Sequence, residues 1–411
     1  MYTIYHILIF VVGFLLKIGA IFNPKLKLFT NGRKLTFSKL QSEISSNNKT
    51  IWMHCASLGE FEQGRPILEK LKAQFPTKKI VLTFFSPSGY EVQKNYEVAD
   101  VVCYLPLDSK KNAQKFLSFI NPEIAIFVKY EFWPNLLKEL KNKQIKTILV
   151  SGIFRENQAF FKWYGGWMRK SLKAFNHFFV QDENSKKLLE KSKLNNITIS
   201  GDTRFDRVYE ITQQNNQLDF IEAFTNNNYT LVAGSTWKED EELLVDYINN
   251  TASKEEKFII APHNINSKDI EQLKNSINKK VVLYSEKENV SLKNYQVFII
   301  DTVGILTKIY KYANVAYVGG GFTKTGVHNV LEPATFGVPI VIGPNYHKFN
   351  EAVELIKNKA CFSIGTSKKL SVLLNKFFNE ESSRTKAGKR ALNYVVEKTG
   401  ATAIILNYLK K

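Results

Sequence analysis

Short apolar runs alternate with longer amphipathic stretches along most of this chain. Most of the short runs are apolar on consecutive residues, which is typical of parallel β-strands covered by helices on both faces. The expected strands are Ile51–Ala56, Ile80–Phe84, Val101–Tyr104, Ile124–Val128, Thr147–Val150, Phe178–Val180, Ile197–Ile199, Thr230–Ala233, Phe258–Ala261, Val281–Tyr284, Val297–Ile300, Val315–Val318, Pro339–Ile342 and Cys361–Ile364. Stretches such as Pro66–Phe75 and Leu136–Lys141 predict helices between them. The alternation indicates an α/β fold with right-handed crossovers and doubly wound sheets.

The strand–helix pattern runs twice, so we predict two Rossmann-like domains. The first spans 25–207 and the second spans 220–395, and the polar run Gln213–Gln217 marks a linker at 208–219. Open α/β sheets bind ligands beyond the carboxyl ends of their strands, so we expect both domains to face one cleft. The final segment, 396–411, contains a helical stretch that can pack back on the first domain. No G-x-G-x-x-G follows the first strand of either half, which weakens a dehydrogenase interpretation.

The first segment, 1–24, is expected to be a membrane anchor. Residues 2–22 are mostly apolar and match the ~20 residues needed to span a bilayer. Basic residues follow directly, namely Lys25, Lys27, Arg33 and Lys34. A signal peptide carries its charge before the apolar run, whereas a basic exit places the rest of the chain on the cytoplasmic side. The alternatives are a helix lying in the membrane interface and an amphipathic core helix.

Composition and charge narrow the class of partner. The 411 residues include 44% hydrophobic and 23% charged residues, which is typical of a globular protein and excludes a disordered chain, a coiled coil and a polytopic membrane protein. The formal net charge is +19, which predicts attraction to nucleic acid, anionic lipid or a phosphorylated substrate. Three cysteines without a C-x-x-C argue against a disulfide framework or a zinc site and favour a reducing compartment.

Two carboxylates directly follow strands of the first half. The first strand ends in Ser57-Leu58-Gly59-Glu60, and Glu60 is expected in the first turn of a helix, where the macrodipole stabilises an acid by about 0.3–1 kcal/mol. A structural role explains Glu60 on this evidence alone. As a general base it would need desolvation by the closing cleft, because the dipole lowers its pKa. Glu131, after Ile124–Val128, is either a helix-entry residue or a carboxylate that binds a sugar hydroxyl.

A basic segment interleaved with aromatic residues follows Thr147–Val150. It contains Arg155, Lys162, Arg169, Lys170 and Lys173 among Phe160, Phe161, Trp163, Tyr164 and Trp167. This pattern suits a membrane surface or a lipid with phosphate groups. It also suits stacking on nucleic acid. A solvated basic face of an amphipathic helix is the structural alternative.

The second half opens with Ala233-Gly234-Ser235-Thr236. Thr236 and Glu239 have the spacing of a capping box, and a capped helix start also presents free N–H groups to a phosphate. His263, after Phe258–Ala261, can face the cleft, whereas we expect His54 and His177 to pack within the fold. No H-x-x-x-H or acidic cluster points to a metal.

The densest group of candidate ligand-binding residues runs from Gly319 to Glu351. Gly319-Gly320-Gly321 ends a buried strand, and we expect its backbone amides to be free to approach an anion. Lys324 and a helix start at Gly326–Glu332 follow, with Asn329 as a possible N-cap and Glu332 as its N3 partner. Glycines, a lysine and a helix N-terminus together predict a phosphate-binding loop, and Glu332 can hold a ribose diol.

These motifs, in this order, resemble those of the bacterial 3-deoxy-D-manno-octulosonic acid (Kdo) transferases of lipopolysaccharide assembly. The matching segments are Ser57-Leu58-Gly59-Glu60, Glu131-Phe132-Trp133-Pro134-Asn135, Gly201-Asp202-Thr203-Arg204-Phe205-Asp206, Ala233-Gly234-Ser235-Thr236 and Gly326–Glu332. The resemblance covers nearly the whole chain. It implies a GT-B fold, in which the first Rossmann-like domain binds the acceptor and the second binds most of the donor. It also implies transfer of Kdo from CMP-Kdo to the lipid A precursor, lipid IVA, at the cytoplasmic face of the inner membrane.

The resemblance also implies roles for individual residues. Glu60 looks like the catalytic base, which would deprotonate the 6'-hydroxyl of the acceptor so that Kdo is transferred with inversion, and Glu131 looks like a second catalytic carboxylate. Donor-binding residues would be Arg204, Ser235, Thr236, His263, Gly320, Gly321, Lys324, His328, Asn329, Glu332 and Glu351. Acceptor-binding residues would be Ser57, Gly59, Arg155, Lys162 and Arg169. We expect no metal and no cofactor besides the substrate CMP-Kdo.

Some positions depart from the family pattern. Lys129 replaces an acid that commonly stands two residues before Glu131, and Pro262-His263-Asn264 stands where the family has Pro-Arg-His. Ser151-Gly152-Ile153 replaces an Asn-Ala-Arg stretch, so Arg155 is the candidate for its arginine. These changes leave open which basic residue contacts the donor, but both leading acids remain.

Two other functions are compatible with parts of the pattern. Another GT-B sugar-nucleotide transferase or epimerase would share the two domains. A membrane-tethered nucleic-acid-binding protein would share the charge, but carboxylates at strand ends would repel phosphates, so we expect no nucleic-acid partner. The expected partners are CMP-Kdo, the lipid A precursor and the inner membrane, reached through a single N-terminal anchor.

Overall fold

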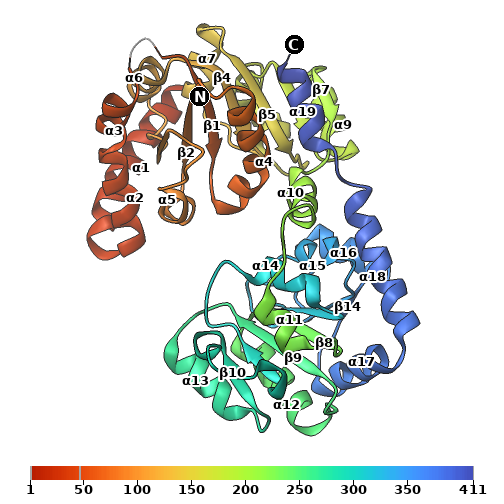
Figure 1. The fold of residues 1–411 in the computed structure, drawn as a ribbon. Helices are drawn as coiled ribbons and strands as arrows, with labels where there is room; N and C mark the ends of the chain where they lie inside the picture. Colours follow the sequence, from red (N-terminus) through yellow and green to blue (C-terminus); the bar gives the residue numbers. More distant parts are fainter. Residues whose placement is uncertain (1, 46–47, 411) are drawn as a thin grey trace. The chain divides into compact units, whose positions relative to one another are not determined.

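The computed structural model describes residues 2–45 and 48–410, and the chain forms two compact units (Figure 1). The first unit comprises Met1–Arg207 and Thr399–Lys411, and the second comprises Val208–Lys398. Each unit contains one parallel β-sheet with helices packed against it. The polypeptide crosses between the units twice, because the end of the chain returns to the first unit.

The first unit is built on a seven-stranded parallel sheet of strand order β3-β2-β1-β4-β5-β6-β7. Its strands are β1 (Thr50–Cys55), β2 (Lys79–Phe84), β3 (Val101–Tyr104), β4 (Pro122–Val128), β5 (Lys146–Gly152), β6 (His177–Val180) and β7 (Ile197–Ile199). Within β1, Trp52 belongs to one hydrophobic core, and its neighbours Ile51 and Met53 belong to another. Adjacent residues therefore pack against opposite helical layers, which is why the strand is apolar on consecutive positions.

The helices of the first unit precede the sheet, connect its strands or follow its last strand, and α10 continues into the second unit. They are α1 (Tyr2–Phe22), α2 (Pro24–Lys34), α3 (Thr36–Glu43), α4 (Leu58–Gln74), α5 (Pro87–Gln93), α6 (Lys110–Ile120), α7 (Pro134–Asn142), η1 (Ala159–Phe161), η2 (Trp163–Gly165), α8 (Gly166–Leu172), α9 (Glu183–Lys191), α10 (Thr203–Thr212) and α19 (Ala401–Leu409). Helix α4 is longer than the predicted stretch Pro66–Phe75, and Pro66 lies inside it.

The second unit repeats the plan with strand order β10-β11-β9-β8-β12-β13-β14. Its strands are β8 (Thr230–Thr236), β9 (Lys257–Pro262), β10 (Val281–Leu283), β11 (Val297–Ile299), β12 (Val315–Val318), β13 (Ile340–Ile342) and β14 (Cys361–Ser363). Its helices are α11 (Asp219–Thr225), α12 (Lys238–Asn250), α13 (Ser267–Ser276), η3 (Tyr284–Glu286), η4 (Leu292–Asn294), α14 (Leu306–Ile309), η5 (Tyr310–Tyr312), α15 (Leu331–Thr335), α16 (Asn350–Lys357), α17 (Ser367–Asn379) and α18 (Glu381–Val396).

The predicted strands are all present and differ from the observed ones only at their ends. The prediction of two doubly wound parallel sheets is therefore confirmed. The predicted linker, 208–219, is partly helical, because it includes the end of α10 and the first residue of α11.

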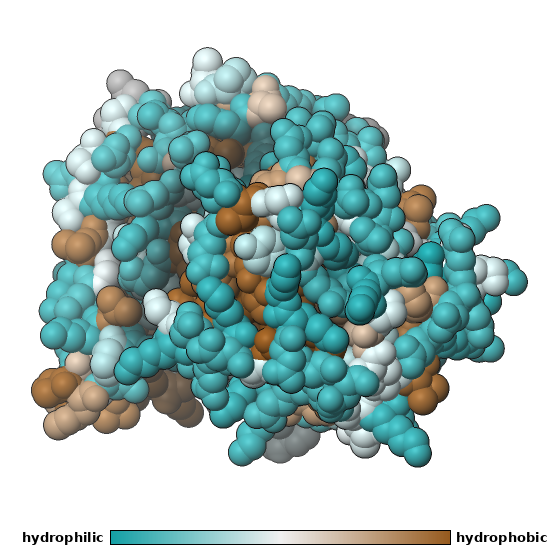
Figure 2. Space-filling view, turned by 60° about the horizontal axis from the view of Figure 1, so that its bottom comes forward, coloured by the Kyte–Doolittle hydropathy of each residue, from teal (hydrophilic) through white to brown (hydrophobic). Residues whose placement is uncertain are grey.

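Helix α1 is long and apolar enough to cross a membrane. Its candidate span, Thr3–Phe22, has a mean hydropathy of 2.2 and is 0% buried. The helix contacts the first unit near its beginning, where the Tyr5 hydroxyl donates a 2.8 Å hydrogen bond to Asp108 Oδ2 and the Tyr5 ring lies 5.5 Å from that of Trp167. Most side chains of α1 are apolar and exposed. By comparison, the face of the molecule in Figure 2 is mostly hydrophilic.

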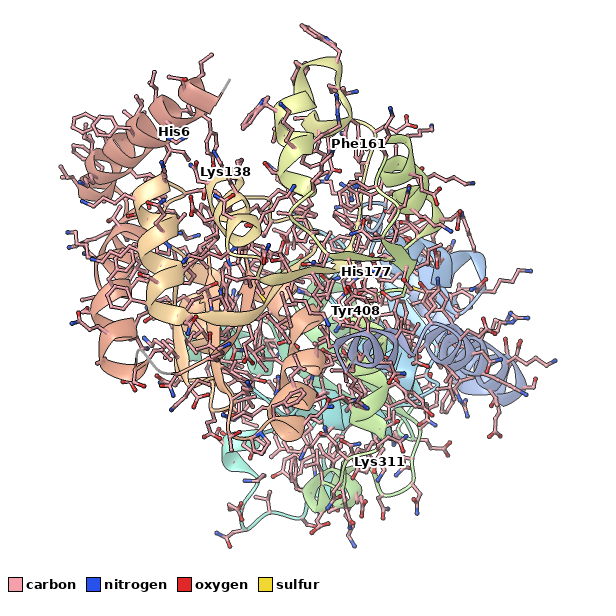
Figure 3. The ribbon with its side chains drawn as sticks, turned by 90° about the horizontal axis from the view of Figure 1, so that it is seen from above. His6, Lys138, Phe161, His177, Lys311 and Tyr408 are labelled. Carbon is pink, nitrogen blue, oxygen red and sulfur yellow. The ribbon has the colours of Figure 1, made fainter. Side chains whose placement is uncertain are left out.

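The last helix, α19, packs within the first unit. Ile405 and Leu409 are buried in the core that also contains α4 residues, and the Tyr408 ring lies 4.6 Å from His177 of β6 (Figure 3). The Asp206 carboxylate of α10 accepts hydrogen bonds from the backbone N–H groups of Gly400 and Thr402 and from the Thr402 hydroxyl. A buried acid distant in sequence therefore caps the start of α19.

Candidate active site

Glu60 lies in the first turn of α4, directly after β1. Ser57 is the N-cap residue, with φ −144°, and Glu60 is at N3. The backbone N–H of Ala56, one residue before the N-cap, donates a hydrogen bond to Glu60 Oε2. Glu60 is only 5% exposed, although the carboxyl end of a strand is where open α/β sheets meet their ligands.

Burial, together with the negative charge of Glu131, raises the pKa of Glu60 to about 7. Hydrogen bonds from the backbone of Ala56 and Ser57 and the charge of Lys129 lower this pKa, but they do not offset the burial. From the sequence we expected the helix dipole to lower this pKa and desolvation to compensate, and the burial of Glu60 supplies that desolvation. A carboxyl group with a pKa near 7 can both accept and release a proton at neutral pH, which suits a general base.

Glu131 lies between β4 and α7 and is held by two ring nitrogens. Trp133 Nε1 donates to Glu131 Oε2 at 3.0 Å, and His54 Nε2 lies 3.3 Å from the same oxygen. His54 is fully buried in β1, and its Nδ1 lies 2.9 Å from Thr83 Oγ1. With its proton on Nε2, His54 donates to Glu131 and accepts the Thr83 hydroxyl proton. The expectation that His54 packs within the fold is confirmed, but the sequence did not predict that it positions Glu131.

The start of α4 leaves room for a ligand. Gly59 is exposed, and a side chain built there would meet nothing within 4 Å. The Ser57 side chain makes no capping hydrogen bond. Burial raises the pKa of Tyr130, and the charges of Glu60 and Glu131 also raise it, whereas the charge of Arg155 lowers it. Tyr130 is therefore close enough to both carboxylates to interact with their charge. These residues are consistent with a place where an acceptor hydroxyl can approach Glu60.

The backbone is also unusual at strand ends. Lys129, Ser151 and Ser235 have φ of 71°, 50° and 54°, values that non-glycine residues seldom adopt. They lie just after β4, near the end of β5 and near the end of β8. Such strain is concentrated at functional sites, so it supports the strand ends as the candidate sites of both units.

The predicted basic residues of the first unit have different surroundings. Arg204 Nε and Nη2 both contact Asp202 Oδ2 at 2.9 Å, so its guanidinium is already paired. Arg169 Nη1 donates to the carbonyls of Phe160 and Lys162, which holds the turn that contains η1 and η2. Arg155 is exposed.

In the second unit, the predicted capping box of Thr236 and Glu239 is wrong. Thr236 is the last residue of β8, and its hydroxyl donates to Glu241 Oε1 at 2.8 Å. Helix α12 begins at Lys238 with Trp237 as N-cap, and the Trp237 N–H donates to Asp240 Oδ2 at 3.0 Å. Strand β8 extends further than its apolar residues indicate, so the N-cap of α12 lies one residue later than predicted.

The loop Gly319–Gly321 follows β12, as predicted, but its amides are not all free. Gly319 N–H donates to the Gly234 carbonyl, and Gly320 N–H donates to Asp240 Oδ2 at 2.8 Å. Asp240 is buried and also accepts from the Tyr317 hydroxyl at 2.7 Å. Burial raises the pKa of Asp240. Asp240 therefore connects the glycine loop to α12. Its carboxylate accepts the Gly320 N–H that we expected to bind an anion.

Gly321 is required by close backbone packing. A side chain at Gly321 would lie 2.5 Å from the Gly343 nitrogen, so the loops after β12 and β13 can approach only through glycines. Lys324 is exposed beside this loop.

Three aromatic rings stack at the carboxyl edge of the second sheet. Trp237 and His263 lie 4.7 Å apart at 21°, and His263 and His328 lie 4.5 Å apart at 22°. Trp237 Nε1 donates to His328 Nε2 at 2.9 Å. Burial and the neighbouring His263 lower the pKa of His328 to about 4. His328 is therefore neutral at pH 7 with its proton on Nδ1, where it can donate a hydrogen bond.

Asn329 and Glu332 lie close together at the start of α15. Asn329 Nδ2 donates to Glu332 Oε1 at 3.0 Å, and Asn329 Oδ1 accepts from the Leu331 backbone N–H at 3.1 Å. Val330 already has helical dihedral angles, φ −79° and ψ −14°, so the Asn329 side chain caps the start of the helix as predicted. Burial raises the pKa of Tyr310, with a further contribution from the charge of Glu332. Glu351 lies in the first turn of α16, as expected.

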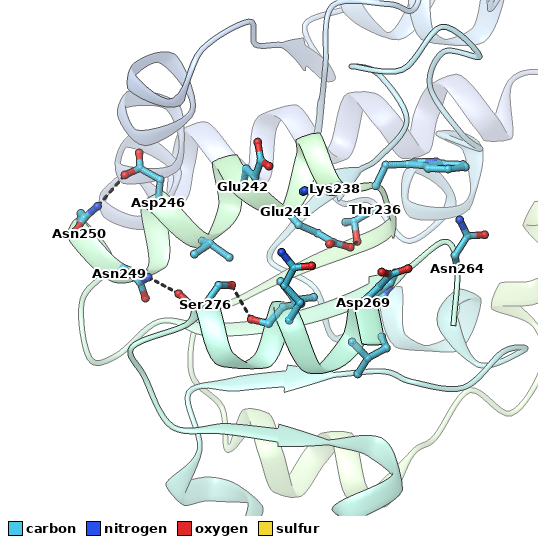
Figure 4. A pocket seen from close by; sticks show the side chains of 16 residues that line it. Thr236, Lys238, Glu241, Glu242, Asp246, Asn249, Asn250, Asn264, Asp269 and Ser276 are labelled. Carbon is cyan, nitrogen blue, oxygen red and sulfur yellow. Dashed lines mark hydrogen bonds between the residues drawn. The ribbon is translucent and has the colours of Figure 1, made fainter. Parts of the chain in front are cut away.

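A cavity of about 510 Å³ lies between α12 and α13 (Figure 4). Thr236, Trp237, Pro262 and Asn264 line its end near the strands. Its charged residues are mainly acidic, namely Glu241, Glu242, Asp246 and Asp269, with Lys238 as the basic residue. This charge disfavours a phosphate, so the cavity does not match the predicted phosphate-binding loop. Within residues 2–45 and 48–410, no group of three or more His, Cys, Asp or Glu side chains could hold a metal ion.

Comparison with known proteins shows what the chain is similar to. A profile of the family described as "3-Deoxy-D-manno-octulosonic-acid transferase (kdotransferase)" matches residues 31–207. The 3-deoxy-D-manno-octulosonic acid transferase of Aquifex aeolicus is 28% identical over 75% of this chain and 80% of its own length. The corresponding enzyme of Haemophilus influenzae is 25% identical over 88% of this chain and 86% of its own length. Over most of its length, the chain is therefore similar to bacterial Kdo transferases.

The chain is also similar to a longer protein. A bifunctional glycosyltransferase/methyltransferase of Fusobacterium nucleatum is 28% identical over 87% of the chain, and the chain spans 57% of that protein.

Solved structures agree on the fold. UDP-GlcNAc 2-epimerase from Neisseria meningitidis has a TM-score of 0.60 at 13% identity, covering 88% of this chain and 100% of its own. MurG from Acinetobacter baumannii has a TM-score of 0.53 at 11% identity, covering 88% and 99%. The chain therefore has the predicted GT-B fold. Identities this low support the fold alone, not a shared substrate.

Proposed function

We propose that this chain is a glycosyltransferase that moves Kdo from CMP-Kdo to the 6'-hydroxyl of the lipid A precursor. The observation that carries the proposal is the buried Glu60 carboxyl, whose pKa of about 7 suits a general base, beside a second carboxylate and an open helix start. The similarity to bacterial Kdo transferases supports the donor and the acceptor class.

In the proposed reaction, Glu60 takes the proton of the acceptor hydroxyl as its oxygen forms a bond to Kdo C2. The bond between C2 and the phosphate oxygen of CMP breaks on the opposite face, and CMP leaves with the electron pair. The configuration at C2 is therefore inverted. Glu131 would hold the acceptor, because its carboxylate is already oriented by His54 and Trp133.

The leaving phosphate needs hydrogen-bond donors in the second unit. Lys324 and the Nδ1–H of His328 are our candidates, since Gly320 N–H is occupied by Asp240. We propose that no metal is needed, so transfer should continue in excess EDTA. We also propose that α1 anchors the chain in the cytoplasmic face of the inner membrane.

Replacement of Glu60 tests the mechanism. Glu60→Gln keeps the shape of the side chain but cannot take a proton, so we expect transfer to fall at least 100-fold while CMP-Kdo binding stays within twofold. In the unmodified chain, transfer should rise with pH and level off above about 7. The assay is mass spectrometry of lipid IVA incubated with CMP-Kdo, which also counts the Kdo residues added. Turnover retained by Glu60→Gln would remove Glu60 from the mechanism.

Nucleotide competition tests the donor. We expect CMP to inhibit transfer at concentrations at which UDP does not. Inhibition by UDP alone would favour another GT-B sugar-nucleotide transferase or an epimerase.

A further inference from the structure

A second cavity, of about 560 Å³, lies in the first unit, away from the start of α4. The turn between η1 and η2 supplies Lys162, α8 supplies Arg169, and the end of α9 supplies Lys191 and Lys193. Glu156 is the acidic residue of the lining. The cavity therefore carries a clear excess of positive charge.

The lysines of this cavity are not neutralised by neighbouring acids. Across residues 2–45 and 48–410, no carboxylate lies within ion-pair distance of the ammonium groups of Lys162, Lys191 or Lys193. Arg169 differs from them, because its Nη1 donates to the carbonyls of Phe160 and Lys162 and so fixes the wall of the cavity. Three lysine side chains without an ion-pair partner therefore lie around a wall that is held in place.

The cavity is next to residues suited to a membrane interface. Trp163 and Tyr164 directly follow Lys162 and are 91% and 48% exposed, and their rings contact each other at 5.7 Å. Exposed Trp and Tyr are typical of the interface, where an apolar ring meets polar headgroups. In the same segment, the Trp167 ring lies 5.5 Å from Tyr5 of α1. Figure 3 shows His6 of α1 and Phe161 of η1 toward the same edge of the unit.

We propose that this cavity binds the phosphate monoester headgroup of a lipid in the bilayer that holds α1. A phosphate monoester carries a charge of about −1.5 to −2 near pH 7 and offers three acceptor oxygens to the lysines. The exposed Trp163 and Tyr164 would place the cavity at headgroup depth. The proposal rests on the membrane location in the proposed function, but not on the transfer reaction.

Calorimetry with short-chain lipids tests this proposal on the full chain in neutral detergent. We expect water-soluble dihexanoyl phosphatidic acid to bind, and dihexanoyl phosphatidylcholine and inorganic phosphate to bind at least tenfold more weakly. The double variant Lys191→Gln/Lys193→Asn should lose at least tenfold in affinity for the phosphatidic acid. Asn is chosen because Lys193 has φ 61°, which Asn tolerates.

A charge-matched variant controls for net charge. Lys186→Gln/Lys187→Gln removes the same charge from the same helix outside the cavity, and it should bind within twofold of the unmodified chain. Equal losses in both double variants, or no loss in either, would overturn the proposal. Inorganic phosphate binding as tightly as the lipid would also overturn it, because the site would then be a free-anion site.

Two checks keep the result interpretable. If the double variant unfolds, Lys191→Gln alone, at an exposed position, should still lose at least threefold in affinity. Binding needs neither CMP-Kdo nor turnover, so it should persist in Glu60→Gln. A failure of the transfer mechanism would thus leave this result unchanged.

Discussion

At the scale of residues, burial decides the chemistry of Glu60. Its position in the first turn of α4 favours the carboxylate through the helix dipole, and two backbone N–H groups add to that effect. Removal from water acts against the charge and is the largest contribution, so the pKa rises to about 7. The same side chain therefore caps a helix and can serve as a base.

Because its pKa is raised, ionised Glu60 lowers the stability of the folded state at high pH. The ordinary pKa is 4.5, so the folded chain holds a proton between pH 4.5 and about 7 that the unfolded chain releases. Stability therefore falls as pH rises through this range. We expect Glu60→Gln to stabilise the chain at pH 8 by up to about 3 kcal/mol, with no such gain at pH 4. Urea unfolding at both pH values measures this, and a gain independent of pH would contradict it.

Trp237 is a positioning residue that the sequence did not reveal. Its indole N–H fixes the His328 tautomer, because an indole can donate but not accept. In Trp237→Phe, the ring can still stack but the donor is lost. We expect the ¹⁵N shifts of His328 in labelled chain to report a single Nδ1–H tautomer at pH 7 and a mixture in the variant. His328→Gln identifies the resonances, and unchanged shifts in Trp237→Phe would contradict the assignment.

At the scale of elements, one acid connects α10 and α19. Asp206→Ala removes the acceptor of three hydrogen bonds and leaves buried donors without partners. We expect the chain to lose about 2–4 kcal/mol of stability and the α19 amides to exchange hydrogen faster, as mass spectrometry can measure. Thr402→Val removes only the hydroxyl donor, so it should cost about 1 kcal/mol. Unchanged exchange in α19 after Asp206→Ala would mean that packing of Ile405 and Leu409 holds the helix alone.

At the scale of the whole molecule, α1 is the proposed connection to the membrane. Phe10 and Phe14 are 79% and 59% exposed, so glutamates there should leave the fold intact. In a bilayer each charge is costly, by about 2.5–3.5 kcal/mol for Asp, Lys or Arg at the centre of an inserted helix. We expect Phe10→Glu/Phe14→Glu to move the chain into the soluble fraction after carbonate extraction.

A matched variant tests whether any exposed apolar residue has this effect. Val303→Glu/Val372→Glu changes side chains of the second unit that are 79% and 65% exposed, and it should leave the chain in the membrane fraction. Retention of both variants in that fraction would assign the attachment to another surface, such as the one around Trp163.

The sequence by itself determined the strands, their parallel arrangement and the strand-end carboxylates. These features depend on local order, since consecutive apolar residues need cover on both faces and a residue after a strand lies at the sheet edge. The cap of α12 was less certain: Thr236 missed the N-cap by one residue, because the ends of strands and helices depend on tertiary hydrogen bonds.

Only the tertiary structure decided which groups support the site. His54 contacts Glu131, which is 77 positions away in the sequence, and Trp237 contacts His328, which is 91 positions away. No spacing along the chain therefore predicts either pair. Asp240 accepts the Gly320 N–H although the two residues are 80 positions apart, and local composition cannot reveal such a hydrogen bond. A pKa likewise depends on burial and on charges brought together by folding, and this is why the Glu60 side chain was predicted but its protonation was not.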